Sequence, residues 1–231
     1  MPVNETGTYW DPVSICNAAL GMLGDVGKAR RMRSMSRGAN TLPIHEVAID
    51  FYFAAKEQMH AMMDWKRTRK VKELTLKVDN DGENEAPVLS GKWTYKYVRP
   101  PDCLIFRKVL DTDGTEWEYD LVVEESVKST NTREAGYGEY YNDEYIYCNV
   151  ADAIGWYTIL IGEERYIPGM GQLHAMILAQ QLAMSATGKI GVRAGLAQEL
   201  QVRAERLCMA LGAKEGYVEK EEGENEYTEH Y

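Results

Sequence analysis

Leu173-His-Ala-Met-Ile-Leu-Ala-Gln-Gln-Leu-Ala-Met-Ser-Ala186 carries apolar residues on every side of a helix. A helix of this kind has no face to turn toward water, so neighbouring elements must cover it. Helical spacing of apolar residues predicts one such neighbour after it, at about Val192–Leu211, and two before it, at Pro12–Leu23 and from Pro43 to about Lys66. The sequence therefore predicts a helical bundle with this central helix.

The residues between Arg69 and Gly169 have a different character. Short segments rich in β-branched and aromatic residues alternate with turn signals such as Pro100-Pro101-Asp102 and Asp111-Thr-Asp-Gly114. The expected strand segments are Val71–Val78, Trp93–Val98, Cys103–Leu110, Glu116–Val123, Glu144–Asn149 and Ala153–Ile161. They predict a small antiparallel β domain.

The order of helices, strands and helices predicts an α+β fold in which the β domain is inserted into one helical bundle. The expected boundaries are 1–69 for the N-terminal part of the bundle, 70–166 for the β domain and 167–213 for the C-terminal part of the bundle. Residues 214–231 are expected to form an extended acidic tail, because they are too acidic and too poor in apolar residues to fold alone.

Composition excludes several classes of protein. The 231 residues are 45% hydrophobic and 27% charged, as in an ordinary soluble globular chain. The 36 acidic and 26 basic residues give a net charge of −10, which argues against broad binding to nucleic acid. Neither a secretory signal nor a continuous apolar run of membrane-spanning length is found, so we expect folding in the cytosol. The four cysteines, Cys16, Cys103, Cys148 and Cys208, are expected to be reduced and buried.

Motifs for catalysis or cofactor binding are not found. The glycines after the first helix and Thr187-Gly-Lys189 are typical of helix ends rather than of phosphate-binding loops. The histidines lack the spacing of a zinc site. We therefore predict no catalytic residue, no metal and no cofactor. An alternative is a carbohydrate-active hydrolase, acting on peptidoglycan, whose carboxylate pair would come from Asp120, Glu124, Glu125, Glu139, Asp143 and Glu144.

A basic loop stands out against the acidic background. Between Lys28 and Arg37 there is no acidic residue, and Arg30, Arg31, Arg33 and Arg37 are candidates for an interface with an acidic neighbour or with the DNA backbone. A polar loop without a partner is the alternative. A second cluster, from Lys66 to Lys72, partly complements a helix C-terminus.

The acidic tail contains aromatic residues that a docking segment could use as anchors. The candidate binding residues are Tyr217, Glu219, Glu221, Tyr227 and Tyr231. A solvated tail without a partner remains the alternative.

Four short motifs, in order along the chain, resemble the head-to-tail adaptor (connector, or tail tubular) proteins of tailed bacteriophages. They are Ile15-Cys-Asn-Ala-Ala-Leu-Gly-Met-Leu-Gly24, Met62-Met-Asp-Trp65, Trp93-Thr-Tyr-Lys-Tyr97 with Pro100-Pro-Asp-Cys-Leu104, and Leu178-Ala-Gln-Gln-Leu-Ala183 running into Ala186-Thr-Gly188. The resemblance extends from about Val13 to Leu211. The basic loop and the acidic tail depart from it.

The resemblance implies a structural virion protein at the head-to-tail junction, assembled in the host cytoplasm. Family members form a ring, typically of twelve copies, under the portal protein, extend the DNA channel and present a platform for a tail or nozzle protein. The long C-terminal extension often reaches into the portal, which would assign that role to 214–231. Genomic DNA would pass through the lumen without specific binding, and no membrane is involved. A non-viral adaptor or binding module is a further alternative.

Overall fold

The computed structural model describes residues 10–24, 31–39, 42–78, 85, 87, 91–128, 139–185 and 190–225, without the side chains of 125–128, 139–142, 184–185, 190–193 and 215–225. The chain forms two compact units. One consists of Met1–Thr68 together with Leu160–Tyr231, and the other of Arg69–Ile159. The first unit is helical, and the second contains two antiparallel sheets of four strands. The mixed α+β class is therefore confirmed.

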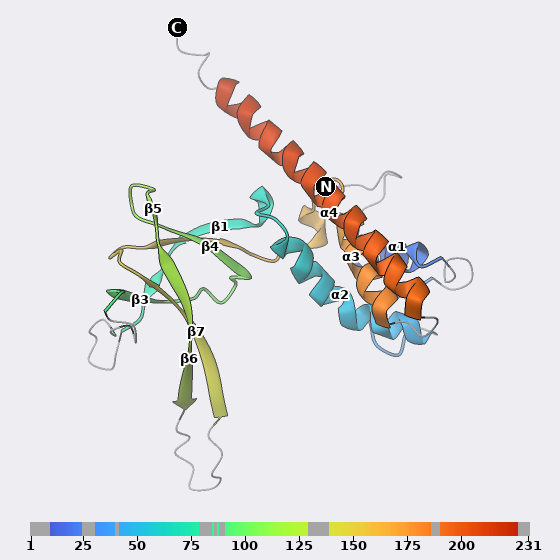
Figure 1. Ribbon diagram of the computed structural model, residues 1–231, viewed down its shortest axis with the longest axis horizontal. Helices are drawn as coiled ribbons and strands as arrows, with labels where there is room; N and C mark the ends of the chain where they lie inside the picture. The colour runs from blue at the N-terminus through green and yellow to red at the C-terminus, as the bar shows by residue number, and fades with distance from the viewer. Residues whose placement is uncertain are drawn as a thin grey trace. The chain divides into compact units, whose positions relative to one another are not determined.

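The described residues of the helical unit form four α-helices, labelled in Figure 1, and two short 3₁₀ helices. Their bounds are α1 Pro12–Met22, α2 Pro43–Ala61, η1 Lys66–Thr68, η2 Glu163–Arg165, α3 Met170–Ser185 and α4 Ile190–Asn225. Helix α3 contacts each of the other three α-helices. Its residues Leu173, His174 and Ala179 lie on three different sides of the helix, and all three are buried. The apolar sequence of α3 is explained by this central position.

Local sequence determines where α1 begins. The Asp11 carboxylate accepts a hydrogen bond from the Ser14 backbone N–H at 2.7 Å, and the Ser14 hydroxyl accepts one from the Asp11 N–H at 2.8 Å. This reciprocal arrangement satisfies two backbone donors that a helix N-terminus leaves unpaired. Pro12 follows in the first turn, where its missing N–H has no cost.

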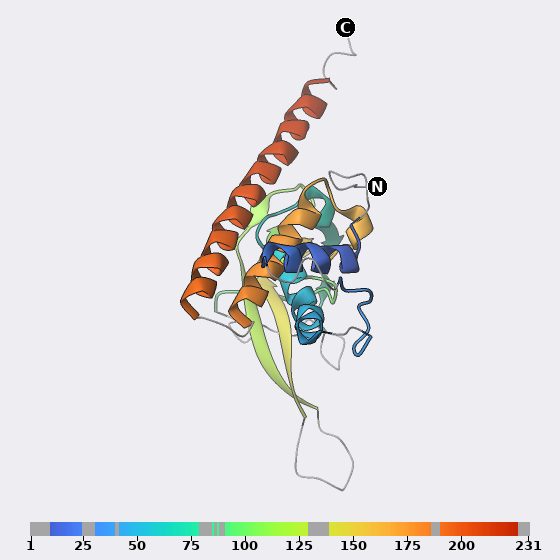
Figure 2. The ribbon, with the colours of Figure 1, turned by 90° about the vertical axis from the view of Figure 1, so that its right-hand side faces the viewer.

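Helix α4 is longer than expected, and this corrects the prediction of a helix ending at Leu211 followed by an extended tail. The helix continues to Asn225. A segment that continues an existing helix avoids the cost of nucleation, so the Lys- and Glu-rich sequence after Ala213 needs no core of its own to become helical. Both ribbon views show this part of α4 extending past α1, α2 and α3 (Figures 1 and 2).

The β unit is built from eight strands in two sheets. One sheet has the order β1 (Arg69–Glu73), β8 (Ile154–Thr158), β4 (Ile105–Leu110) and β5 (Glu116–Trp117). The other has the order β2 (Thr75–Leu76), β3 (Tyr95–Val98), β7 (Glu139–Cys148) and β6 (Tyr119–Lys128). Every pairing is antiparallel, as predicted.

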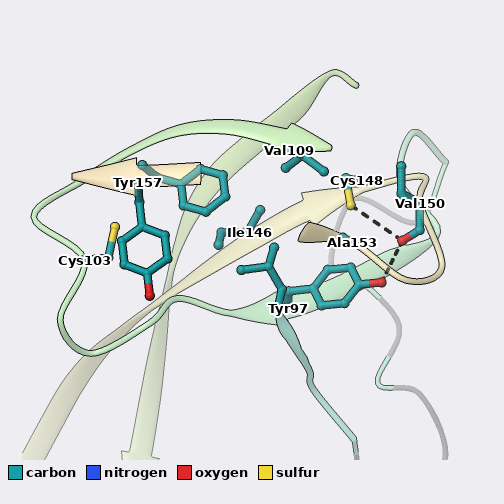
Figure 3. Packing of buried hydrophobic residues seen from close by; sticks show 10 residues of the cluster. Tyr97, Cys103, Val109, Ile146, Cys148, Val150, Ala153 and Tyr157 are labelled. Atoms are coloured by element: carbon teal, nitrogen blue, oxygen red, sulfur yellow. Dashed lines mark hydrogen bonds between the residues drawn. The ribbon is translucent and has the colours of Figure 1, made fainter. Parts of the chain in front are cut away.

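The main core of the β unit takes residues from both sheets (Figure 3). The Tyr97 hydroxyl donates a 2.6 Å hydrogen bond to the Val150 carbonyl oxygen, so this buried aromatic ring has a partner for its polar end. Gly155 of β8 faces the same core, where a Cβ atom would lie 2.6 Å from Leu74 Cδ2. The side chains of Leu74 and Phe106 therefore occupy the space that a side chain at position 155 would need.

The prediction for the cysteines is confirmed. Cys16, Cys103, Cys148 and Cys208 are all buried free thiols. Burial raises the pKa of each thiol above its ordinary value, which keeps the groups protonated and unreactive at neutral pH.

Candidate interaction surfaces

The described part of the basic loop is held against α1. The Asn17 side chain donates to the Met32 carbonyl oxygen at 3.0 Å and accepts from the Met32 N–H at 2.8 Å. The Met32 side chain is buried in the helical unit. Because Met32 points inward, its neighbours Arg31 and Arg33 are exposed on either side of it. The loop thus presents two of the four predicted arginines from a defined backbone.

Arg37 has a partner within the chain. Its guanidinium donates to the carboxylate of Asp50 on α2, and the N–H of the next residue, Gly38, donates to Glu46 Oε1 at 3.0 Å. Both partners of the Arg37–Asp50 pair are exposed, so the pair stabilises the fold by at most about 1 kcal/mol. Arg30 lies outside the described residues. That the four arginines form a partner interface stays a prediction.

The predicted C-terminal docking residues lie in or beyond α4. Tyr217, Glu219 and Glu221 belong to the α4 backbone, and their side chains are outside the described part. Tyr227 and Tyr231 also fall outside the described residues. The last described side chain of α4 that is buried is Leu211. After Leu211, the described side chains of α4 are those of Ala213 and Lys214, and both are exposed.

A buried polar network, not anticipated from the sequence, joins η2 to α2. Glu163 accepts hydrogen bonds from the Tyr52 hydroxyl at 2.5 Å and from Lys56 Nζ at 2.8 Å. Burial by itself would raise the pKa of the Glu163 carboxyl group, but the hydrogen bonds from Lys56 and Tyr52 outweigh it and lower the pKa. The carboxylate is therefore ionised and fully engaged, as in a structural ion pair.

Two buried histidines complete this network in neutral form. His174 Nε2 donates to the Tyr52 carbonyl oxygen at 3.1 Å, and its Nδ1 accepts from the Tyr166 hydroxyl at 3.2 Å. His60 Nδ1 donates to the Lys56 carbonyl oxygen at 2.7 Å. Burial lowers the pKa of His60, and it lowers the pKa of His174 to about 4. The two imidazole rings therefore stay neutral at pH 7 and serve as hydrogen-bond donors and acceptors within the core.

The His174 environment predicts that the helical unit loses stability in mild acid. The unfolded chain takes up a proton near pH 6.5, whereas the folded chain resists it until about pH 4. The contribution of His174 is thus fully present above pH 6.5 and falls as the pH drops toward 4, by about 2 kcal/mol at pH 5. Thermal unfolding followed between pH 7 and pH 5 checks this.

The matched variant for this prediction is His174→Gln, which keeps a donor for Tyr52 but has no titratable group. It is expected to be less stable than the natural protein at pH 7 and to show a smaller loss between pH 7 and pH 5. Equal losses in both proteins would contradict the assignment to His174.

A second buried ionic cluster lies on the outer face of the sheet β2-β3-β7-β6. Lys96 is 1% exposed and donates to Glu85 and Glu124, each at 2.6 Å. Its ammonium group also lies 4.1 Å from the centre of the Tyr145 ring. The Tyr147 hydroxyl donates to the Glu124 carboxylate. These contacts satisfy a charge that would otherwise be costly to bury.

Asp120 and Glu144, two of the carboxylates proposed for a hydrolase, form hydrogen bonds and ion pairs within the β unit. Asp120 accepts hydrogen bonds from Trp93 Nε1 at 2.8 Å and from Lys92 Nζ at 3.0 Å, and the bonds from Lys92 and Trp93 lower its pKa. Glu144 pairs with Arg99, whose guanidinium also donates to the Cys103 and Leu104 carbonyl oxygens. A general acid needs a raised pKa, whereas the pKa of Asp120 is lowered.

The side chains of Glu125 and Glu139 lie outside the described part of the chain. A cleft of about 520 Å³ lies beside the Arg99–Glu144 pair, and Lys77, Pro100 and Tyr145 also line it. The cleft is open to solvent, and its lining contains both basic and acidic side chains. Among the described residues, no cluster of three His, Cys, Asp or Glu side chains could hold a metal ion. Within the same residues, no helix has the length and apolar character needed to cross a membrane.

No protein-family model matches the chain, and no curated protein is significantly similar to it in sequence.

Proposed function

We propose that this protein is a head-to-tail adaptor of a tailed bacteriophage, a structural subunit that forms a ring under the portal and carries the tail or nozzle protein. Two features support the proposal. The chain combines a helical unit made from both ends of the sequence with an antiparallel β unit from its middle, and the motifs that resemble the family lie in both units. Its buried Lys56, Lys96 and His174 are used in structural networks.

The observation that carries the proposal is the length of α4. Up to Leu211 the helix packs on α3 and buries Ala197, Leu200 and Ala204. From Gly212 to Asn225 it continues past the other helices. A helical segment of this length is marginally stable in water by itself, so it gains most from a partner that covers it. We infer that this C-terminal arm, 212–231, docks on the portal.

Repetition of the arm around a ring would make this attachment strong. A single arm pays the full entropy of ordering and binds weakly. Arms tethered in one ring act at high effective concentration, and such linkage strengthens binding by about 10²–10⁴ without any new contact. The tyrosines at 217, 227 and 231 supply apolar surface, and the glutamates supply charge for a basic groove.

The net charge suits a channel through which DNA slides. Each copy carries −10, so a ring of identical copies is strongly acidic as a whole. If much of this charge faces the lumen, it repels the phosphate backbone and prevents adhesive contacts. Arg31 and Arg33 would then contact an acidic neighbour rather than DNA. A ring with a mainly basic lumen would contradict this part of the proposal.

The decisive experiment mixes the purified full chain with the cognate portal and images the product by electron microscopy. A symmetric ring of this protein on one end of the portal is the expected result. Portal particles that stay bare at saturating concentrations of the chain would overturn the proposal. Clearing of a cell-wall suspension by the purified chain would support the hydrolase alternative instead.

Deleting residues Glu219–Tyr231 is expected to weaken attachment to the portal by at least about 100-fold, because the avidity of the arms is lost. The melting temperature should change by no more than about 2 °C, since the last buried side chain described on α4 is Leu211. Co-sedimentation with the portal and thermal unfolding measure the two effects. A collapse of thermal stability would show that the arm belongs to the core.

A further inference from the structure

Among the described residues, each of the two sheets of the β unit ends in one short and one long edge strand. Sheet β1-β8-β4-β5 ends in β1 and β5, and sheet β2-β3-β7-β6 ends in β2 and β6. Strands β2 and β5 have two residues each, whereas β1 has five and β6 has ten. An edge strand presents unpaired backbone donors and acceptors, so a long edge is a template for another strand.

Strand β6 has the features of an edge that is covered in an assembly. Leu121 and Val123 are 49% and 57% exposed, although they lie on the face that turns toward the core. Strand β3 pairs only with Tyr145–Cys148 of β7, so beyond this point β6 and β7 form a ribbon of two strands, visible at the end of the β unit in Figures 1 and 2. Ribbons of two strands are marginally stable alone.

Strand β1 is the complementary edge. Val71 is 55% exposed and pairs with Trp156 on the outer face of its sheet, while Lys70 and Lys72 pair with the core residues Tyr157 and Gly155. The strand has three cations, Arg69, Lys70 and Lys72, against one carboxylate. Strand β6 has three carboxylates, Asp120, Glu124 and Glu125, before its first cation at Lys128. Like charges disfavour pairing of β1 with β1 or of β6 with β6.

We propose that β6 of one copy pairs in antiparallel register with β1 of the next copy, with Val123 opposite Val71. This inference rests on the proposed function, since it specifies the contact between neighbours in the ring. In this register Lys70 of one copy lies opposite Glu124 of the other copy. Both side chains also keep the partners that they have within their own copy. The exposed apolar residues Leu121, Val123 and Val71 then share one face of the joined sheet, where cross-strand pairs stabilise each other.

The same register avoids a steric conflict. Val123 points to the core side of its own sheet, and Val71 points away from the core of its sheet. When Val123 and Val71 point to the same side of the joined sheet, sheet β1-β8-β4-β5 of the copy that contributes β6 lies on one side of it. Sheet β2-β3-β7-β6 of the copy that contributes β1 then lies on the opposite side. Because two different edges meet, the contact is head-to-tail and repeats from copy to copy, as a ring requires.

Cysteine cross-linking tests this contact directly. Val71→Cys and Val123→Cys are made in separate chains, mixed, and oxidised both free at high concentration and bound to the portal. The four natural cysteines are buried and stay out of the reaction. We expect a disulfide-linked dimer from the mixture at least about tenfold above that from either variant alone, and a ladder of higher species from a chain with both substitutions. Val202→Cys on α4, at 40% exposure, mixed with Val123→Cys is the matched control.

Each outcome separates the inference from the proposed function. Symmetric portal complexes without the mixed cross-link would overturn the inference and leave the adaptor role standing. A strong mixed cross-link in a chain that never binds the portal would support the strand pairing and refute the adaptor role. Preferential cross-linking of Val123→Cys with itself would show a two-fold contact and overturn the head-to-tail arrangement. Mixed cross-links no stronger than the Val202→Cys control would likewise reject the pairing.

Discussion

Glu163→Ala is expected to lower the free energy of unfolding of the helical unit by about 3–5 kcal/mol, because it leaves the buried Lys56 ammonium without its carboxylate. The Tyr52 hydroxyl loses its acceptor at the same time. Urea unfolding followed by circular dichroism at 222 nm measures this loss. The helical signal should disappear at a markedly lower midpoint than in the natural protein.

The matched control is Glu199→Ala on α4, which removes an exposed partner of Arg203. Its expected cost is below about 1 kcal/mol. Replacing both members of the buried pair, Lys56→Met with Glu163→Leu, should recover much of the loss, because no unpaired charge is then buried. Equal effects of Glu163→Ala and Glu199→Ala would mean that the network is solvated rather than buried.

Lys96→Ala is expected to destabilise the β unit by a similar amount, about 3–5 kcal/mol. The substitution leaves Glu124 and Glu85 without the cation that both contact and opens a cavity beside the Tyr145 ring. Tryptophan fluorescence reports on this unit through Trp93, which packs in the same cluster as Tyr145 and Tyr147, and Trp65 of the helical unit adds to the same signal. The unfolding midpoint by fluorescence should fall well below that of the natural protein.

Lys108→Ala provides the comparison for Lys96→Ala, because Lys108 forms an exposed pair with Glu116 on β5. We expect its cost to stay below about 1 kcal/mol. If Lys96→Ala unfolds at the midpoint of Lys108→Ala, the burial of Lys96 contributes no stability. Glu124→Gln should be intermediate, because it keeps hydrogen-bonding capacity for Lys96 and Tyr147 but removes the charge.

The two buried networks matter for the proposed ring because neighbouring subunits can only fit together if each subunit keeps one defined structure. Each network ties together segments that are distant along the chain: Glu163 lies 107 residues from Lys56, and Glu124 lies 28 residues from Lys96. Buried polar groups that are fully satisfied hold a unique arrangement, since a shifted packing would leave a charge without a partner. Both units thus offer defined surfaces for the strand and arm contacts proposed above.

Several elements followed directly from sequence patterns. Helix α1 begins at Pro12 as expected, and the all-round apolar stretch from Leu173 became the helix that contacts the other three α-helices. A turn signal separated strands as predicted at Gly114, whose φ of +82° suits a residue without a side chain. The segments Val71–Val78 and Glu116–Val123 were predicted wrongly as single strands, because each forms two strands that lie in different sheets. The end of α4 was predicted wrongly, because composition describes whether a segment folds alone and not whether it extends an existing helix.

The buried charges were missed although each left a signal. Lys56 follows Tyr52 by four residues and precedes Met59 by three, so it falls on the apolar stripe of α2. Lys96 alternates with Tyr95 and Tyr97 in a strand of otherwise apolar residues. A lone cation in such a place predicts a buried partner, but the partner itself comes from another element. Sequence spacing alone does not identify it.

By itself, the sequence determined the class of fold, the central helix, the antiparallel character of the β unit and the reduced state of the cysteines. Periodicity, caps and turns act over a few residues, so they can be recognised without a fold. Only the tertiary structure decided that Glu163 neutralises Lys56, that Arg37 is bound by Asp50 while Arg31 and Arg33 are exposed, and which strands lie at the edges of the sheets. Those facts depend on contacts between distant segments, whose pairing is set by the packing of the whole unit rather than by any local pattern.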